Sequence, residues 1–199
     1  ILGYALEARC GEGGTHMNGV GHLTKLLLLE LCKRTDRYAL EPDDIELIST
    51  AAGLHDIGKV LIPESILKKP GKLTAAEFEL VKQHTTLGAR LAEMPAYQNE
   101  ALVKYIIEIC LRHHERWNGE GYPDGLRGDE CPIAAQVTAL ADVYDALTSE
   151  RCYKKAYSHK EALKMILEGQ CGAFNQKEGL IPRSLLRNKL FQDMEEVIY

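Results

Sequence analysis

Long apolar runs are missing from this 199-residue sequence, in which no stretch approaches the roughly 20 residues of a membrane-spanning helix. Basic residues are also in the minority, with 24 Lys and Arg against 29 Asp and Glu, which disfavours broad coating of a nucleic-acid backbone. Ile1–Arg9 does not have the pattern of a secretory signal peptide. We therefore expect a cytoplasmic domain that binds no DNA or RNA and makes no membrane contact. A small phosphate ester stays open as a ligand, provided that metal ions reverse the charge locally.

Paired cysteine motifs are absent as well. Six cysteines stand at positions 10, 32, 110, 131, 152 and 171, and no two form a CxxC pair. This spacing disfavours a zinc ribbon and a thioredoxin-like redox site. Their even number leaves a disulfide set as an alternative, but their place in helical patterns favours reduced thiols that fill apolar space.

Strand signals hardly occur, whereas helical periodicity recurs along the chain. The capping boxes Thr74-x-x-Glu77 and Ser158-x-x-Glu161 each predict the start of a helix. The glycine-rich run Gly11–Gly21 is poor helix material. We expect one all-α domain over residues 1–199, a compact bundle of about six to eight helices with a weakly helical tail over 175–199. Its main helices are predicted over about 22–34, 42–55, 74–91, 100–114, 132–149 and 158–169.

One connection is longer than a helical bundle normally needs. Residues 115–131 are rich in glycine and contain Pro123. Long loops in compact domains are usually functional or disordered, and the aromatic side chains of Trp117 and Tyr122 argue against disorder.

The chemistry of the chain is concentrated in histidines. His84, for example, lies four residues after Leu80 and seven before Leu91, and the carboxylate of Asp142 is embedded in an apolar helix. Buried imidazoles and carboxylates are costly unless they are paired or bind metal, and inward-facing groups of this kind form the metal sites of helical bundles. A set of buried ion pairs, for example Asp142 with one histidine, is the alternative interpretation. It would require several of these imidazoles and carboxylates to pair with one another at the same time. Four of the seven histidines continue the apolar stripe of a predicted helix: His55, His84, His113 and His114.

Three ordered motifs resemble the HD-GYP family of the HD superfamily of metal phosphohydrolases. Residues 55–59 read HDIGK, similar to the HDxGK signature of the superfamily. Residues 113–123 read HHERWNGEGYP and resemble the HHE…GYP stretch that defines the family, and residues 141–149 read ADVYDALTS, similar to its last helix. The motifs cover about residues 8–174, and a single HD dipeptide would be much weaker evidence.

The resemblance implies a set of ligands and substrate-binding residues. Glu12 and His16, spaced like the Glu-x3-His of the family, would complete a third metal position. Lys59 would be catalytic with Asp56, by holding a phosphate or the leaving group. The implied substrate-binding residues are Lys59, Tyr122, Asp145, Arg151 and Lys154, although the two last could equally be surface charges. Asp145, one turn after Asp142, could instead orient a ligand or a substrate-binding lysine. The implied metal ligands are His55, Asp56, His84, His113, His114 and Asp142.

The charge of this site explains why it needs metal. Glu12, Asp56 and Asp142 together carry −3 and would repel a phosphodiester, whereas two or three divalent ions bring +4 or +6. A mixed imidazole and carboxylate set suits iron or manganese, with zinc as a further option. With Asp56 bridging two metals, a metal-bridged hydroxide would attack phosphorus in line.

The resemblance implies a cyclic dinucleotide phosphodiesterase, which cuts cyclic di-GMP to pGpG, to GMP or to both. The alternatives are another nucleotide phosphohydrolase of the superfamily and a non-enzymatic cyclic dinucleotide-binding signalling module. We also expect a regulatory or sensor domain N-terminal to this stretch, and a homodimer is a further option. The sequence does not separate cyclic di-GMP from cyclic GMP-AMP.

Glu12 is the residue that decides between two and three metal ions. It is four residues before His16, so one helical turn would bring both side chains to one face. We expect purified protein to carry three ions per chain, and Glu12→Ala to carry two with reduced activity, as measured by elemental analysis and anomalous density. An unchanged count in a fully active variant would mean that Glu12 is a solvated loop carboxylate.

Overall fold

The chain folds as a helical bundle in the computed structural model, which describes residues 15–93, 95–150 and 155–175. These residues form α-helices and two short 3-10 helices, with no strand among them beyond one isolated bridge between Asn118 and Arg127. The prediction of an all-α fold is confirmed. The elements are α2 (His16–Cys32), α3 (Pro42–Ala52), η1 (Ile57–Leu61), α4 (Glu64–Leu67), α5 (Ala75–Lys82), α6 (His84–Ala92), α7 (Ala101–Arg112), η2 (Gly128–Glu130), α8 (Ile133–Thr148) and α9 (His159–Leu167).

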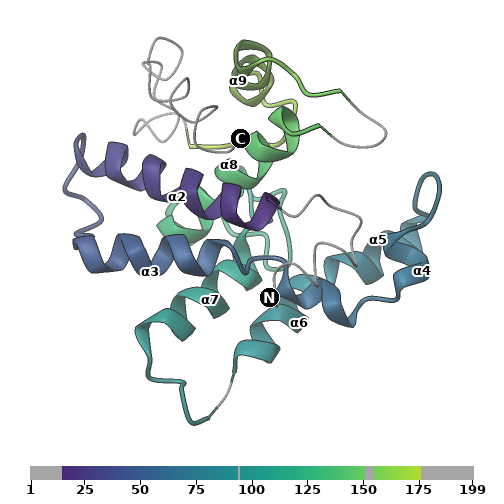
Figure 1. Cartoon of the computed structure of the whole chain (residues 1–199), viewed down its shortest axis with the longest axis horizontal. Helices are drawn as coiled ribbons and strands as arrows, with labels where there is room; N and C mark the ends of the chain where they lie inside the picture. Colours follow the sequence, from purple (N-terminus) through teal and green to yellow (C-terminus); the bar gives the residue numbers. More distant parts are fainter. Residues whose placement is uncertain (1–14, 94, 151–154, 176–199) are drawn as a thin grey trace.

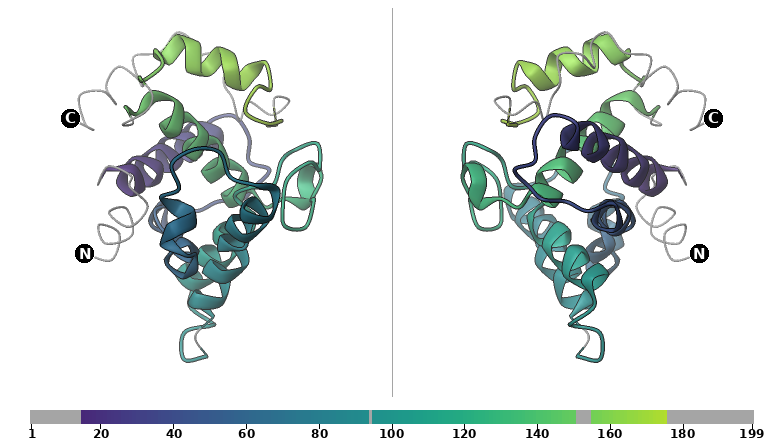
Figure 2. Two further views of the ribbon diagram at one scale, coloured as in Figure 1. Left: turned by 90° about the vertical axis from the view of Figure 1, so that its right-hand side faces the viewer. Right: turned by 90° about the vertical axis from the view of Figure 1, so that its left-hand side faces the viewer.

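Four long helices make the centre of the bundle. α2 packs against α3 and α8, and α7 packs against α3, α6 and α8 (Figure 1). α9 covers α8 at one end of the molecule, and the α6–α7 pair lies at the opposite end (Figure 2). The core contains fully buried aliphatic side chains from each central helix, including Leu28, Ile48, Ile109 and Val137. Removal of this apolar surface from water is the main force that holds the helices together.

The helix predicted to begin near His22 begins six residues earlier, at His16. The glycine-rich run was expected to be poor helix material, but its described part from His16 onward is helical, and Gly19 and Gly21 lie inside α2 at close contacts with other elements. A Cβ atom on Gly19 would come 2.6 Å from Asp145 Oδ1, and one on Gly21 would come 2.8 Å from the carbonyl oxygen of Ser49. The glycines lower helix propensity, but they let α2 approach α8 and α3, and the packing that follows outweighs this cost.

The single helix predicted over about 74–91 is two helices, α5 and α6, which meet at Gln83. Leu80 and Leu91 are each 42% exposed, so they do not form the apolar stripe that was expected to bury His84. His84 is nevertheless buried, because the face of α6 that meets η1 consists of His84, Thr85, Gly88 and Ala89. The small side chains on this face allow α6 to lie close to η1, which the spacing of the leucines did not indicate.

Other local predictions are confirmed. The capping boxes at Thr74 and Ser158 both form. The carboxylates of Glu77 and Glu161 accept hydrogen bonds from the backbone N–H groups of Thr74 and Ser158. The remaining predicted helices end within about three residues of their expected bounds, as helix termini usually do. The four described cysteines, Cys32, Cys110, Cys131 and Cys171, are free thiols. Among the described residues, no helix has the length and apolar character that crossing a membrane requires. The weakly helical tail expected over 175–199 lies outside the described residues except for Asn175, and the single-domain assignment stays a prediction.

Gly58 sets the distance between η1 and α6. A Cβ atom on Gly58 would overlap the carbonyl oxygen of His84 and come 2.5 Å from the backbone nitrogen of Gly88. Backbone atoms of a helix cannot move aside as a flexible side chain can, so the two elements must separate.

We expect Gly58→Ala to lower the free energy of unfolding by about 3 kcal/mol or more, as measured by urea denaturation. The matched control is Gly71→Ala, because nothing lies within 4 Å of a Cβ at that position. Its positive φ of 112° leaves only backbone strain, about 1 kcal/mol. Equal losses in the two variants would contradict the close-packing role of Gly58.

Candidate metal centre

Helix ends bring the predicted ligands together. His16 and His84 are the first residues of α2 and α6, and His113 and His114 directly follow α7. His55 and Asp56 lie between α3 and η1, and Asp142 projects from the middle of α8. Two groups within these residues have ligand atoms less than 4.8 Å apart, and both include the carboxylate of Asp56: Asp56, His84, His113 and His114 in the first, and His16, His55 and Asp56 in the second.

Backbone carbonyl groups fix the orientation of three buried imidazoles. Nδ1 of His55 lies 2.8 Å from the carbonyl oxygen of Ala52, and Nδ1 of His84 lies 2.7 Å from that of Val81. Nδ1 of His113 lies 2.9 Å from the carbonyl oxygen of Ile109. Because a carbonyl oxygen only accepts hydrogen bonds, each Nδ1 carries the proton and each Nε2 presents a lone pair.

These lone pairs converge on a carboxylate. Nε2 of His84 lies 3.2 Å from Asp56 Oδ1 and 3.3 Å from Nε2 of His113, and Nε2 of His113 lies 3.8 Å from the same Asp56 oxygen. Neither Nε2 of His55 nor Oδ1 of Asp56 makes a hydrogen bond with a described residue, and both atoms are buried. Electron pairs brought this close repel one another unless a cation lies between them. The residues present therefore fit a metal ion.

The second group of ligands contains His16. Its Nδ1 lies 2.6 Å from Asp145 Oδ2, and its Nε2 lies 3.5 Å from Asp142 Oδ1. Nε2 of His55 lies 3.7 Å from the same Asp142 oxygen. A carboxylate that accepts the Nδ1 proton of a ligating histidine is a common arrangement behind a metal ligand. Asp145 was predicted to bind substrate or to orient a ligand, and the contact with His16 supports the second role.

Burial and charge control the protonation of the cluster. Burial lowers the pKa of His113 and of His114 well below the ordinary value, and the neighbouring imidazoles add to the shift. Burial alone would also lower the pKa of His55, but the charge of Asp56 raises it to about 9. Burial opposes ionisation of Asp56, yet Lys59 and His55 hold its pKa well below the usual range. The cluster thus favours an ionised Asp56 and neutral imidazoles at His113 and His114, and the negative charge of Asp56 favours a cation beside His55 Nε2.

Two of the predicted substrate-binding residues, Lys59 and Tyr122, lie beside the cluster. The ammonium group of Lys59 lies 2.5 Å from Asp56 Oδ2. The ring of Tyr122 stacks on His114 with 4.6 Å between the ring centroids and 24° between their planes. The ammonium group of Lys82 lies 5.4 Å from the centroid of the Tyr122 ring. Glu12, Arg151 and Lys154 lie outside the described residues, so their roles stay predictions.

Sequence reasoning missed Glu115 and Lys82. Glu115 is 3% exposed, and its carboxylate accepts hydrogen bonds from the backbone N–H groups of residues 124, 125 and 126. The available signal was a carboxylate directly before a glycine-rich loop. His22 and His159 have no role in the family resemblance. His159 is the first residue of α9, and its Nδ1 lies 2.7 Å from the Tyr144 hydroxyl oxygen.

Comparisons with known sequences agree with this geometry. A family model of the HD domain matches residues 16–173. A probable cyclic di-GMP phosphodiesterase from Vibrio cholerae is 43% identical over 195 residues, which cover 96% of this chain and 44% of that protein. A cyclic di-GMP phosphodiesterase from Thermotoga maritima is 42% identical over 83% of this chain and 42% of its own length. A 3'3'-cGAMP-specific phosphodiesterase 2 from Vibrio cholerae is 36% identical over 88% of this chain and 32% of its own length. The chain thus spans less than half the length of these curated relatives.

Solved structures share the fold. A cyclic GMP-AMP-specific phosphodiesterase of V. cholerae, V-cGAP3, matches with a TM-score of 0.67 and 17% identity, covering 99% of this chain and 51% of that one. The HDG"Y"P protein Bd1817 from Bdellovibrio bacteriovorus matches with a TM-score of 0.64 and 22% identity, covering 87% of this chain and 52% of that one. At these identities the likeness concerns the arrangement of helices.

The contact between Asp145 and His16 predicts a measurable effect on metal retention. We expect Asp145→Ala to lose metal at about 10- to 100-fold lower chelator concentration, because the His16 ring is no longer held in its ligating orientation. The control is Ser149→Ala, which removes a hydroxyl 3.3 Å from Asp145 Oδ2 and leaves the His16 contact in place. Titration with a chelator, followed by elemental analysis, measures both. Identical retention in both variants would mean that Asp145 does not orient a ligand.

Proposed function

This chain belongs to the HD domain family, in its HD-GYP branch, and from that premise we propose that it is a metal-dependent phosphodiesterase that hydrolyses a cyclic dinucleotide. The observation that carries the proposal is the convergence of imidazole lone pairs on Asp56, which requires a cation. Relatives named for cyclic di-GMP reach 46% identity, whereas those named for 3'3'-cGAMP reach 36%, and this difference favours cyclic di-GMP as the substrate. The products are pGpG, GMP or both.

The residues that would hold the metal ions are those of the two described groups, with Asp142 beside them. We also assign Glu12, which precedes His16 by four residues in the sequence, to this set. Imidazole and carboxylate ligands together favour iron or manganese, with zinc as a further option, and two or three divalent ions fit the number of ligands. When bound, such ions polarise phosphoryl oxygens and lower the pKa of water, which makes a nucleophile at neutral pH.

Lys59 has two tasks in this proposal. Its ammonium group neutralises Asp56 and helps to keep that carboxylate ionised. It also lies at the edge of the cluster, so it can donate a hydrogen bond to a phosphate oxygen or to the leaving oxygen of the ribose. A positive charge at that oxygen stabilises the charge that develops as the phosphodiester bond breaks.

The second phosphate and the bases need contacts away from the cluster. Arg151 and Lys154 follow α8, and we assign them to the second phosphate of the cyclic dinucleotide. Tyr122 presents an aromatic ring on which a base can stack, and stacking on an aromatic side chain is worth about 1–3 kcal/mol per base. These contacts hold the substrate in the ground state and in the transition state alike.

The chain covers less than half of each of these relatives, which supports a regulatory or sensor domain elsewhere in the protein. We place that domain N-terminal to this one. We also propose that the domain is cytoplasmic, with a homodimer as a further option.

The test combines a substrate panel with two kinds of variant. We expect Asp56→Ala to abolish hydrolysis of cyclic di-GMP while retaining some binding, because the shared ligand is lost and the phosphate contacts remain. Arg151→Ala and Lys154→Ala should instead raise KM with little change in kcat, since they remove uniform binding. Near-normal turnover by Asp56→Ala would contradict the mechanism.

The panel contains cyclic di-GMP, 3'3'-cGAMP, linear dinucleotides and dNTPs. Binding of cyclic di-GMP without turnover by metal-loaded wild-type protein would show a binding module instead. Turnover confined to dNTPs would place the chain with other nucleotide phosphohydrolases.

A further inference from the structure

Glu115 directly follows the last two histidines of the site, yet its carboxylate turns away from them. Its oxygens accept backbone hydrogen bonds of 2.7 Å from Asp124, 3.1 Å from Gly125 and 3.0 Å from Leu126. A buried carboxylate is stable only when its charge is compensated, and three N–H donors supply that compensation here. The residue therefore joins the start of the 115–131 loop to the segment that follows Pro123.

The loop is folded back on itself around this contact. Gly121 lies so close to Glu115 that a Cβ atom would overlap the Glu115 Cα and the Arg116 backbone nitrogen. The backbone N–H of Tyr122 donates to the carbonyl oxygen of His114 at 3.3 Å. The two sides of the loop pair again farther out, where the Gly128 N–H donates to the Trp117 carbonyl oxygen at 3.0 Å. The Glu115 carboxylate is the one side chain among the described residues that bonds three backbone N–H groups of this loop.

The folded-back loop fixes the position of the Tyr122 ring. Tyr122 lies between the Gly121 contact and the three N–H groups that Glu115 holds, so both its flanks are tied to the end of α7. Its ring stacks on His114 and faces the ammonium group of Lys82. Without the carboxylate, the three N–H groups would have to turn to water, and the loop would lose its attachment beside His114.

We propose that Glu115 is the positioning residue for the 115–131 loop: it holds Tyr122 against His114 as the aromatic wall of the substrate site and does not itself bind metal. This inference rests on the proposed function for the role of Tyr122 as a wall, whereas the loop attachment stands by itself. It also gives the third residue of the HHE motif a task different from that of the two histidines before it.

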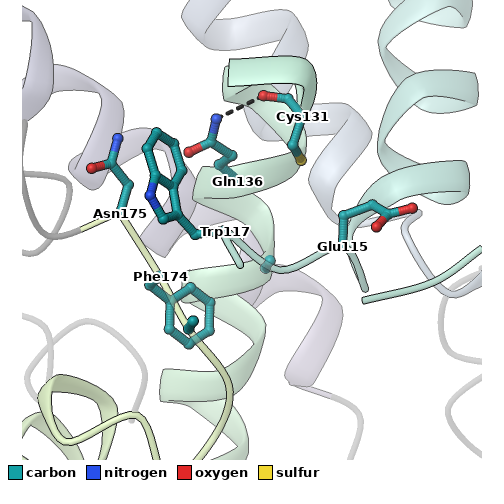
Figure 3. A pocket seen from close by; sticks show the side chains of 8 residues that line it. Glu115, Trp117, Cys131, Gln136, Phe174 and Asn175 are labelled. Carbon is teal, nitrogen blue, oxygen red and sulfur yellow. Dashed lines mark hydrogen bonds between the residues drawn. The ribbon is translucent and has the colours of Figure 1, made fainter. Parts of the chain in front are cut away.

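The fluorescence of Trp117 can report the position of the loop without a measurement of enzyme activity. It is the only tryptophan in the chain and lies two residues from Glu115. Figure 3 shows its indole beside Asn175, Gln136 and Phe174, while the Glu115 side chain points away from this group. The backbone N–H of Trp117 donates a hydrogen bond to the carbonyl oxygen of Ala173 at 2.9 Å. Intrinsic fluorescence therefore reports whether the loop keeps its packing.

The primary variant is Glu115→Gln, which keeps the shape but presents an N–H₂ group to at least one of the three donors. Its matched control is Glu120→Gln, since Glu120 is an exposed residue of the same loop whose carboxylate accepts a hydrogen bond from Asn118. We expect Glu115→Gln to increase acrylamide quenching of Trp117 and to raise KM for cyclic di-GMP about tenfold. Metal content should equal that of wild type, and kcat should stay within about threefold, since the catalytic ligands are unchanged. The control should match wild type in all four measurements.

A double-mutant cycle tests whether the effect passes through Tyr122. The variants are Glu115→Gln, Tyr122→Ala and both together. If Glu115 acts by placing the Tyr122 ring, the double variant should have the KM of Tyr122→Ala within about twofold. KM increases that multiply would show that Glu115 acts independently of Tyr122 and would overturn the proposal. A loss of metal in Glu115→Gln alone would overturn it too, by making Glu115 a ligand.

The loop attachment can still be tested if Glu115→Gln fails to fold or if the wild-type protein hydrolyses no cyclic dinucleotide. If Glu115→Gln does not fold, Gly121→Ala breaks the same attachment from the other side of the loop, and the same quenching and KM changes are expected. If wild-type protein hydrolyses no cyclic dinucleotide, the proposed function fails, but the quenching difference between Glu115→Gln and Glu120→Gln still decides the loop attachment. Equal quenching in these two variants would contradict it.

Discussion

The structure depends on the carboxylate of Asp56 and the imidazole nitrogens that face it. Three histidines donate their Nδ1 protons to backbone carbonyl groups in the turn before them, so the lone pairs of their Nε2 atoms point into one buried space. Such an arrangement is unfavourable by itself, because burial and mutual repulsion both act against it. It is stable when a cation occupies that space, which makes folding and metal binding parts of one equilibrium.

Helix ends are what bring these groups together. Side chains at a helix terminus lie on the boundary between regular backbone and loop, so residues from α2, α6 and α7 reach one point without breaking a helix. Close packing at glycines allows the approach: Gly19 lets α2 contact Asp145, Gly58 lets η1 contact α6, and Gly121 lets the loop contact Glu115. The metal centre is thus built by backbone contacts as much as by its ligands, and a single methyl group at such a position would move a ligand.

The sequence predicted the helical class, the capping boxes and most helix bounds, because these follow from local patterns. It predicted the burial of His84 for a wrong reason, since the leucines that seemed to share its face are exposed and small residues of α6 form the buried face. It underestimated α2, because the cost of its glycines is local whereas the gain in packing comes from α3 and α8. Glu115 was missed because its partners are backbone N–H groups nine to eleven residues away, and the residue types of the loop do not identify such partners.

By itself the sequence determined which chemistry the protein carries. The order and types of residues in the three motifs specify imidazole and carboxylate ligands, and a chain of 199 residues with recurring helical periodicity folds as a bundle. Only the tertiary structure decided how these side chains meet: that Asp56 is shared by two groups, that Asp145 contacts His16, and that Glu115 accepts hydrogen bonds from backbone N–H groups of the loop. The physical reason is range. Propensity and periodicity act over a few residues, whereas the distances that define this site join residues up to 129 positions apart and depend on how closely the helices pack.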